Sequence, residues 1–170
     1  AAVTNVTMEH LDYHGTMKEY IRAKGLLFSS INGAGTKVLN VDDVSFSVFE
    51  EIPAARTSPY SPSHDIDIVQ ADAVSSQATV LFGGQAYTLS LPIPGTFNLS
   101  NALCAMHCVA AVGIAPQDAV RALGTFCGTA GRMERVDAGQ PFTVFVDFTV
   151  TPIAYKRGAP RKSGDALEAW

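Results

Sequence analysis

TNVTMEHLDYHGTMKEY, residues 4–20, is the stretch of sequence that decides the fold. The apolar residues 1–3 run into it, and together they predict a short buried strand that ends in polar residues. From Met17 onward apolar residues recur three or four positions apart, which predicts a helix that continues through Phe28. A strand that ends in polar side chains and feeds a helix is typical of the binding sites of open α/β sheets.

Two histidines in this stretch have two interpretations. His10, Asp12 and His14 follow one another at two-residue spacing, in a segment without a clear period. Spacing alone favours ordinary loop histidines, because the specific ligand patterns of metal sites are absent. The alternative is that the strand end presents them to a metal ion.

Composition limits the classes of partner. The chain has 170 residues, enough for one hydrophobic core and part of a second small one. Its formal net charge is −4. Because the chain carries no excess of positive charge, nucleic acid is not an expected partner. No apolar run is long enough to span a bilayer. The three cysteines form no pair at two-residue spacing, and their odd number without a signal peptide indicates a reducing compartment. We therefore expect a cytoplasmic protein that binds no membrane.

A second polar strand end follows at residues 40–43. Val38–Val41 predicts a short buried strand, which Asn40, Asp42 and Asp43 close with polar groups. Capping of the next segment is the favoured interpretation. A carboxylate beside a ligand is the alternative.

The middle of the chain predicts a small antiparallel sheet. Proline and serine residues indicate a loop at 51–65. Alternation then predicts strands at Ile66–Val69, Ala78–Phe82 and Tyr87–Leu91, and Gly83-Gly84 is typical of a hairpin turn.

An almost wholly apolar run from Phe97 to Val112 predicts a buried helix. Asn98 and Asn101 lie three apart at its start, so one of them is expected as the N-cap. Two neighbouring amides also suit the edge of a planar heterocycle, because each offers a donor and an acceptor. A further helix is predicted from Pro116 to Leu123.

The C-terminal third contains a glycine-rich turn and one more strand. Residues 128–134 end in Arg132 and Glu134, which suit a solvated turn and a ligand site equally well. Phe142–Val146 predicts a buried, parallel strand with Asp147 at its C-terminal end. Residues 156–164 are polar and basic and suggest a loop or a loose tail.

Four separated motifs resemble the Mur ligase family. Residues 4–15 resemble its TN-(L/I)-(S/T)-x-DHLDYHG segment, AKGLLF (23–28) its AK-x-x-LF helix, FNLSNA (97–102) its FN-(V/L)-x-NA motif, and residues 131–134 its GRME motif. The first and last look most like the member that adds the third peptide residue to UDP-N-acetylmuramoyl-L-alanyl-D-glutamate. The resemblance covers roughly residues 1–152.

The resemblance implies a magnesium site. His10 would help to bind the second Mg²⁺ ion, and Lys24 would be the catalytic lysine that this family carbamylates. Carbamylation makes chemical sense, because Mg²⁺ prefers hard oxygen donors and an ammonium group would repel it.

The resemblance also implies a nucleotide site and a reaction. Asn98 and Asn101 would contact the adenine of ATP, Arg132 the nucleotide phosphates, and Asp147 the ribose hydroxyls. The family transfers the γ-phosphoryl of ATP to a substrate carboxylate. An amino acid, diaminopimelate or lysine, then attacks the acyl phosphate and gives ADP, phosphate and a peptide bond.

Departures from the family pattern predict an internal piece of such a ligase. The sequence contains no Gly-x-x-Gly-Lys-Thr/Ser phosphate loop, so the 170 residues alone are expected to be inactive. Glu9 replaces the usual aspartate, and Val150 stands where the family has a histidine. The expected fold is α/β, the C-terminal part of a Mur ligase central ATPase domain. It comprises the remnant of a parallel sheet with helices, a small antiparallel sheet, and the first strand of the C-terminal Rossmann-like domain.

The expected division is a partial central domain at 1–130, the start of the C-terminal ligase domain at 131–152, and a divergent polar tail at 153–170. Two other classes remain open. One is a non-catalytic binding or scaffolding module derived from a Mur ligase, which the departures favour. The other is a folate-type ligase relative. The edge at residues 1–6 is expected to be exposed and favours self-association.

Overall fold

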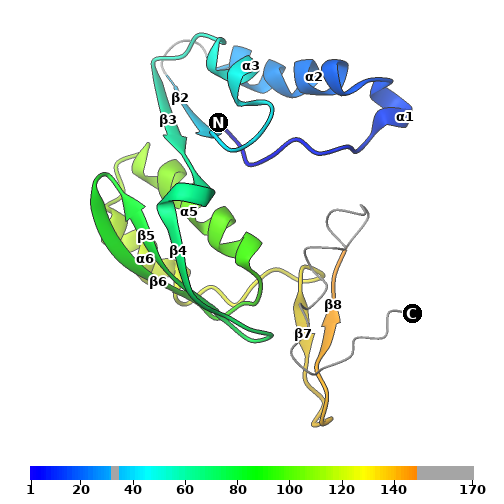
Figure 1. The fold of residues 1–170 in the computed structure, drawn as a ribbon, viewed down its shortest axis with the longest axis vertical. Helices are drawn as coiled ribbons and strands as arrows, with labels where there is room; N and C mark the ends of the chain where they lie inside the picture. The colour runs from blue at the N-terminus through cyan, green and yellow to red at the C-terminus, as the bar shows by residue number, and fades with distance from the viewer. Residues whose placement is uncertain (32–34, 149–170) are drawn as a thin grey trace.

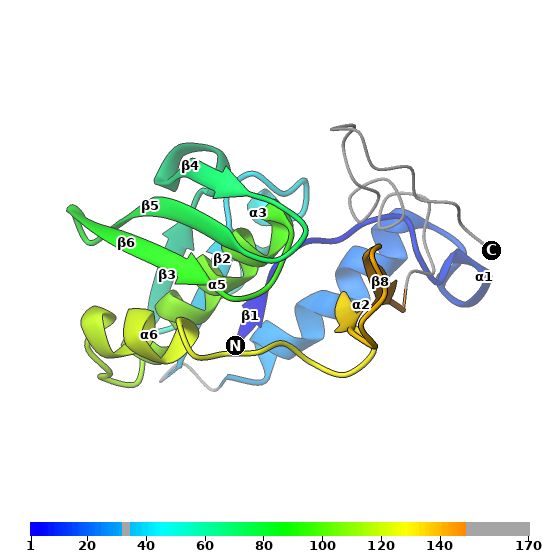
Figure 2. The same ribbon diagram turned by 90° about the horizontal axis from the view of Figure 1, so that it is seen from below.

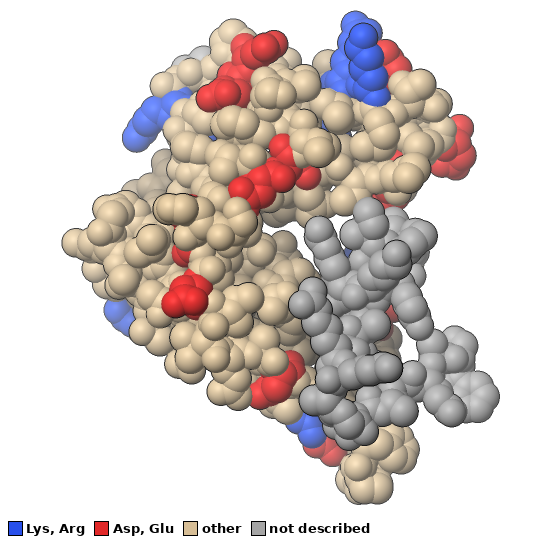
Figure 3. Space-filling model, in the orientation of Figure 1, with Lys and Arg blue, Asp and Glu red and all other residues tan. Residues whose placement is uncertain are grey.

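A computed structural model of the chain describes residues 1–31 and 35–148. Two three-stranded sheets lie on either side of one long helix, and a separate two-stranded hairpin extends away from them (Figure 1, Figure 2). None of the helices in this part of the chain has the length and apolar character needed to cross a membrane. On the face drawn in Figure 3, charged side chains are separated by broad uncharged surface.

The first sheet is parallel and is covered on both faces. Its order is β1 (Ala2–Val3), β2 (Thr36–Asn40), β3 (Arg56–Tyr60). Because successive side chains of a strand point to opposite faces, Leu39 packs toward α2 (Met17–Ser29) and α3 (Phe46–Glu50), whereas Val38 packs against the long helix α5 (Thr96–Ala110).

The second sheet is the predicted antiparallel meander. It consists of β4 (Ile66–Ala71), β5 (Ser76–Phe82) and β6 (Gln85–Leu91). Gly83 and Gly84 have φ values of 58° and 77°, which a primed hairpin turn requires and which glycine adopts without strain. One face of the meander packs on α5 (Thr96–Ala110) and α6 (Pro116–Leu123) around the buried Leu89 and Leu99. Helix α5 therefore contributes to the cores of both sheets.

Two predictions about strands were wrong. Residues 51–65 are not a plain loop, because they contain β3 and the short helix α4 (Pro62–Asp65). Pro59 has no N–H to donate, but β3 is an edge strand of the described sheet, where proline is tolerated. Of the run Phe142–Val146, β8 (Val144–Val146) is half-exposed and pairs antiparallel with β7 (Glu134–Val136), because the loop at 137–143 reverses the direction of the chain.

Several smaller expectations also changed. The opening strand is only two residues long and half-buried, although Val6 beyond it is buried. Leu11–His14 form the short helix α1, which the spacing of the histidines did not predict. The predicted polar tail and Val150 lie outside the described residues.

His107 lies where α5 meets both sheets. Its Nδ1 is 2.8 Å from Ser58 Oγ, and its ring contacts those of Tyr60 and Phe82 at centroid distances of 5.5 and 4.6 Å. Burial lowers the pKa of His107, and the carboxylate of Asp65 opposes this change only partly. The neutral imidazole is therefore the form that fits the folded protein.

We expect acid to destabilise the chain through His107. In the unfolded chain the imidazole binds a proton near its ordinary pKa of 6.5, whereas the folded pKa is lower. The stabilisation is therefore present above pH 6.5 and is lost as pH falls toward the folded pKa. Thermal unfolding between pH 7.5 and 5.5 should show a fall in Tm that is smaller in His107→Gln. The exposed His64 provides the control, and a fall that disappears in His64→Gln instead would contradict this assignment.

Candidate functional site

The first group of site residues surrounds the ring of Tyr20. Thr16 accepts a hydrogen bond from the Glu19 backbone N–H (3.2 Å) and so caps the N-terminus of α2. This start places Tyr20 on the buried face of the helix, where it is only 6% exposed. Lys24 lies one turn later, with its Nζ 5.3 Å from the centre of the Tyr20 ring.

His10, which precedes α1, contacts the same ring. Its φ is +56°, a left-handed backbone that costs a non-glycine residue about 1–2 kcal/mol. The imidazole meets the Tyr20 ring edge-on at 6.1 Å, its Nε2 is 3.6 Å from a Glu9 oxygen, and the side chain remains 62% exposed. His14 stacks on Tyr20 at 4.9 Å. Two residues that the sequence connects only through the resemblance thus lie around one aromatic ring.

Tyr20 itself was missed as a member of the site. Its position in the apolar period of α2 is indistinguishable from that of a core residue. The only available signal was its spacing, since it lies four residues before Lys24 and therefore on the same face of the helix.

A magnesium ion at this group would have to be bound mostly by water and phosphate. Across residues 1–31 and 35–148, no three His, Cys, Asp or Glu side chains gather to hold a metal by themselves. Mg²⁺ in phosphoryl-transfer sites takes one or two protein oxygens and completes its shell with phosphates and waters. A carbamate on the exposed Lys24, together with His10, would provide such a partial shell.

The second group begins at the N-terminus of α5. The predicted asparagine cap was wrong, because Gly95, with φ +93°, occupies the N-cap position and no side chain caps the helix. Asn98 instead donates through Nδ2 to the carbonyl of Pro94 (2.7 Å), and Asn101 Nδ2 approaches Asn98 Oδ1 at 3.4 Å. The two amides do lie side by side, as their spacing predicts.

The β7–β8 hairpin brings Arg132 and Asp147 together. Arg132 donates to the carbonyl of Phe148 (3.0 Å), and its guanidinium lies 5.0 Å from the centre of the Phe148 ring. The Met133 N–H donates to Asp147 Oδ1 (3.0 Å), and Met133 takes a left-handed φ of +48°. Specific contacts therefore fix the turn. A turn that is merely solvated would not need them.

A cavity of about 480 Å³ lies between this turn and the loop before α5. Arg132 lines one side and Pro94, whose carbonyl holds Asn98, lines another. The lining does not include Asn98, Asn101 or Asp147 themselves.

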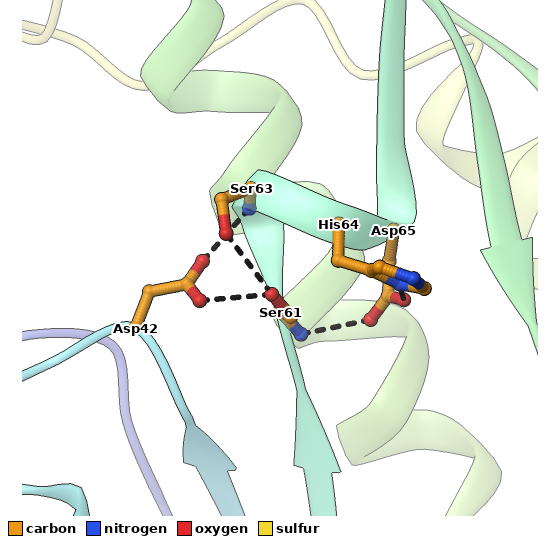
Figure 4. Close-up of polar contacts among 5 residues, drawn as sticks. All are labelled: Asp42, Ser61, Ser63, His64 and Asp65. Carbon is orange, nitrogen blue, oxygen red and sulfur yellow. Dashed lines mark hydrogen bonds and ion pairs between the residues drawn. The ribbon is translucent and has the colours of Figure 1, made fainter.

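A third polar group joins the turn after β2 to the start of α4. It contains serine, histidine and aspartate but not a nucleophile–base pair (Figure 4). Ser61 Oγ donates to Asp42 (2.8 Å), and the Ser63 N–H donates to the other Asp42 oxygen (2.7 Å). His64 Nδ1 contacts Asp65, its neighbour in the sequence, at 3.0 Å. Although burial raises the pKa of Asp42, these hydrogen bonds outweigh it and lower the pKa. The group is a set of structural bonds, but Asp42 binds Ser61 and Ser63 at the start of α4 rather than the next segment, which the capping interpretation predicts.

Comparison with known proteins identifies a family and related sequences. Residues 1–109 match the family of Mur ligase middle domains. The UDP-N-acetylmuramoyl-L-alanyl-D-glutamate--2,6-diaminopimelate ligase of Bacillus velezensis is 37% identical over 164 residues, which cover 89% of this chain and 33% of the relative. The enzyme of the same name from Chlorobaculum tepidum is 36% identical, with 92% of this chain and 34% of the relative covered.

A solved structure shows the same fold. MurF from Acinetobacter baumannii matches with a TM-score of 0.79 at 20% identity, over 92% of this chain and 35% of that chain. The chain thus spans about a third of the length of the curated relatives that it matches.

Proposed function

Because the chain belongs to the Mur ligase family, we propose that it is part of an ATP-dependent ligase that joins an amino acid to UDP-N-acetylmuramoyl-L-alanyl-D-glutamate. The cited relatives are named for 2,6-diaminopimelate, so this is the proposed amino acid. The observation that carries the proposal is the meeting of His10 and Lys24 at the ring of Tyr20.

The group around Tyr20 would form the protein side of a magnesium site. Carbamylated Lys24 would contribute an anionic oxygen and His10 a nitrogen. Tyr20 would hold both side chains by contact with its ring. A bound Mg²⁺ would offset the charge of the phosphoryl group that passes from ATP to the substrate carboxylate.

The second group would hold the nucleotide. The Arg132 guanidinium, kept in place by the Phe148 carbonyl and ring, suits phosphate oxygens. Asp147 would accept hydrogen bonds from the ribose hydroxyls. Asn98 and Asn101 would face the edge of the adenine, at the side of the cavity that Pro94 lines.

The division of the chain follows from these roles. We assign residues 1–130 to the central ATP-binding domain, 131–152 to the start of the C-terminal ligase domain and 153–170 to a polar tail. The substrates are ATP, the uridine-linked dipeptide and the amino acid, so the proposed location is the cytoplasm, where peptidoglycan precursors are assembled.

A carbamate on Lys24 is the expected signature of this function. In buffer with ¹³C-bicarbonate and Mg²⁺, the chain should show a carbamate carbon resonance that Lys24→Arg removes. Lys18 lies on the same helix and is also exposed, so Lys18→Arg is the matched control and should keep the resonance. Absence of the resonance from the wild-type chain would contradict the proposed ligase site and favour the non-catalytic module.

A further inference from the structure

The end of β2 holds the segment that leads to His10. Asp43 divides its two carboxylate oxygens between two parts of the chain. Oδ2 accepts from the backbone N–H of Val6 at 3.0 Å, while Oδ1 accepts from the backbone N–H (3.0 Å) and the hydroxyl of Ser45. Each bond has an ionised acceptor, which makes it stronger than a bond between neutral groups.

Asn40 adds a second attachment, at Thr4, two residues before Val6. Its Nδ2 donates to the carbonyl of Thr4 at 2.9 Å, and its Oδ1 accepts from the Asp42 N–H at 3.0 Å. Thr4 and Val6 therefore each have one backbone polar group bound by a side chain, from the last residue of β2 and from the turn after it. The Val6 side chain is 3% exposed and is fixed in the core below α2.

These two bonds replace the strand pairing that stops early. β1 ends at Val3, so the ladder to β2 gives no support to the residues that follow. His10 nevertheless keeps a left-handed backbone, and such conformations persist only where the surroundings determine them.

We propose that Asp43, assisted by Asn40, is a positioning residue that sets where the imidazole of His10 lies. The metal role of His10 rests on the proposed function, but the placement of the ring does not. The Asp43 carboxylate has a bond to Val6 on one side and to Ser45 on the other, so it fixes the distance between the two segments.

Asp42 is a matched control within the same turn. It is also an aspartate just beyond the end of β2, and its carboxylate accepts from the Ser61 hydroxyl and the Ser63 N–H. Its partners lie on the opposite side, at the end of β3, next to His64 (Figure 4). The two neighbouring carboxylates thus hold different segments, each with its own histidine as a reporter.

The test compares imidazole spectra of the metal-free 170-residue chain and its variants. Asp43→Ala should move the His10 ring resonances and leave those of His64 in place, whereas Asp42→Ala should do the reverse. Mn²⁺, in bicarbonate buffer, serves as a paramagnetic substitute for Mg²⁺ and should broaden the His10 resonances. The metal affinity measured from this broadening should be about 10- to 100-fold lower in Asp43→Ala than in the wild-type chain. Asp42→Ala should leave that affinity unchanged.

Unmoved His10 resonances in a folded Asp43→Ala chain would overturn the proposal. If Mn²⁺ fails to broaden His10 in the wild-type chain, the proposed metal role fails, while the metal-free spectra still decide the positioning role. Should Asp43→Ala lose its fold, Asp43→Asn provides the answer. An amide has one acceptor oxygen where the carboxylate has two, so either the Val6 or the Ser45 bond must break, and His10 should still shift.

Discussion

Replacement of Lys37 by alanine is expected to lower the free energy of unfolding by about 3 kcal/mol or more. Lys37 lies on the central strand β2, is 1% exposed, and donates through Nζ to three backbone carbonyls. These belong to Phe49 (2.8 Å), Glu50 (2.9 Å) and Ile52, at the C-terminus of α3. The last carbonyls of a helix have no partner within it, and an ammonium group is well suited to them.

Loss of the ammonium group would leave the Glu50 and Ile52 carbonyls without their Lys37 donor, at a cost of about 1–3 kcal/mol for each unsatisfied group before water re-enters. The Phe49 carbonyl would still accept from the Ile52 N–H at 3.3 Å. Urea unfolding of wild type, Lys37→Ala and Lys37→Met separates the contributions. Methionine keeps most of the volume but none of the donors, so it should recover only the part of the loss that comes from the cavity. Lys18→Ala, on the exposed face of α2, should stay within about 0.5 kcal/mol of wild type. A Lys37→Met chain as stable as wild type would contradict this account.

Phe49→Ala should be of similar or larger effect, about 3–5 kcal/mol of the free energy of unfolding. The Phe49 side chain is 1% exposed, and its ring lies 5.1 Å from that of Phe28 on α2. The ring also packs close to Gly25 on α2, where an added Cβ would lie 3.7 Å from it. Removal of the ring would leave a cavity between α2 and α3.

The neighbouring Val48 provides the control, because it lies on the same short helix but is 45% exposed. Val48→Ala should change the stability by less than about 0.5 kcal/mol, with an unchanged urea m-value. Equal losses in the two variants would mean that α3 contributes through its backbone and not through the aromatic contact.

The parts of the fold that the sequence predicts are those determined by residues close together in the sequence. Helix α2 has its apolar period, and the meander has alternating strands with Gly83-Gly84 between two of them. β3 was missed because its pairing with β2 is parallel and distant in sequence, while Pro59 and the serines beside it are typical of a loop. α3 is only five residues long, and its stabilising partner, Lys37, precedes it on another element.

The candidate site shows the same limit. His10 and Lys24 came from the family resemblance, because neither spacing nor composition identifies them. Tyr20 stayed hidden among core residues, and the asparagines were assigned to a cap that Gly95 occupies through its positive φ. In each case the residue makes a contact with a distant part of the site, while its local sequence is equally well explained by a core position or a helix cap.

Because α5 contributes to both cores, the first sheet cannot complete its core until α5 has been synthesised. Val38 and Tyr60 leave the ribosome before Leu103 and Cys104, the α5 residues that cover them. At about 5–20 residues per second, that face of the nascent parallel sheet stays uncovered for roughly a few seconds. Synthesis therefore passes through an interval in which a chaperone has an apolar surface to bind, and the interval closes when α5 docks.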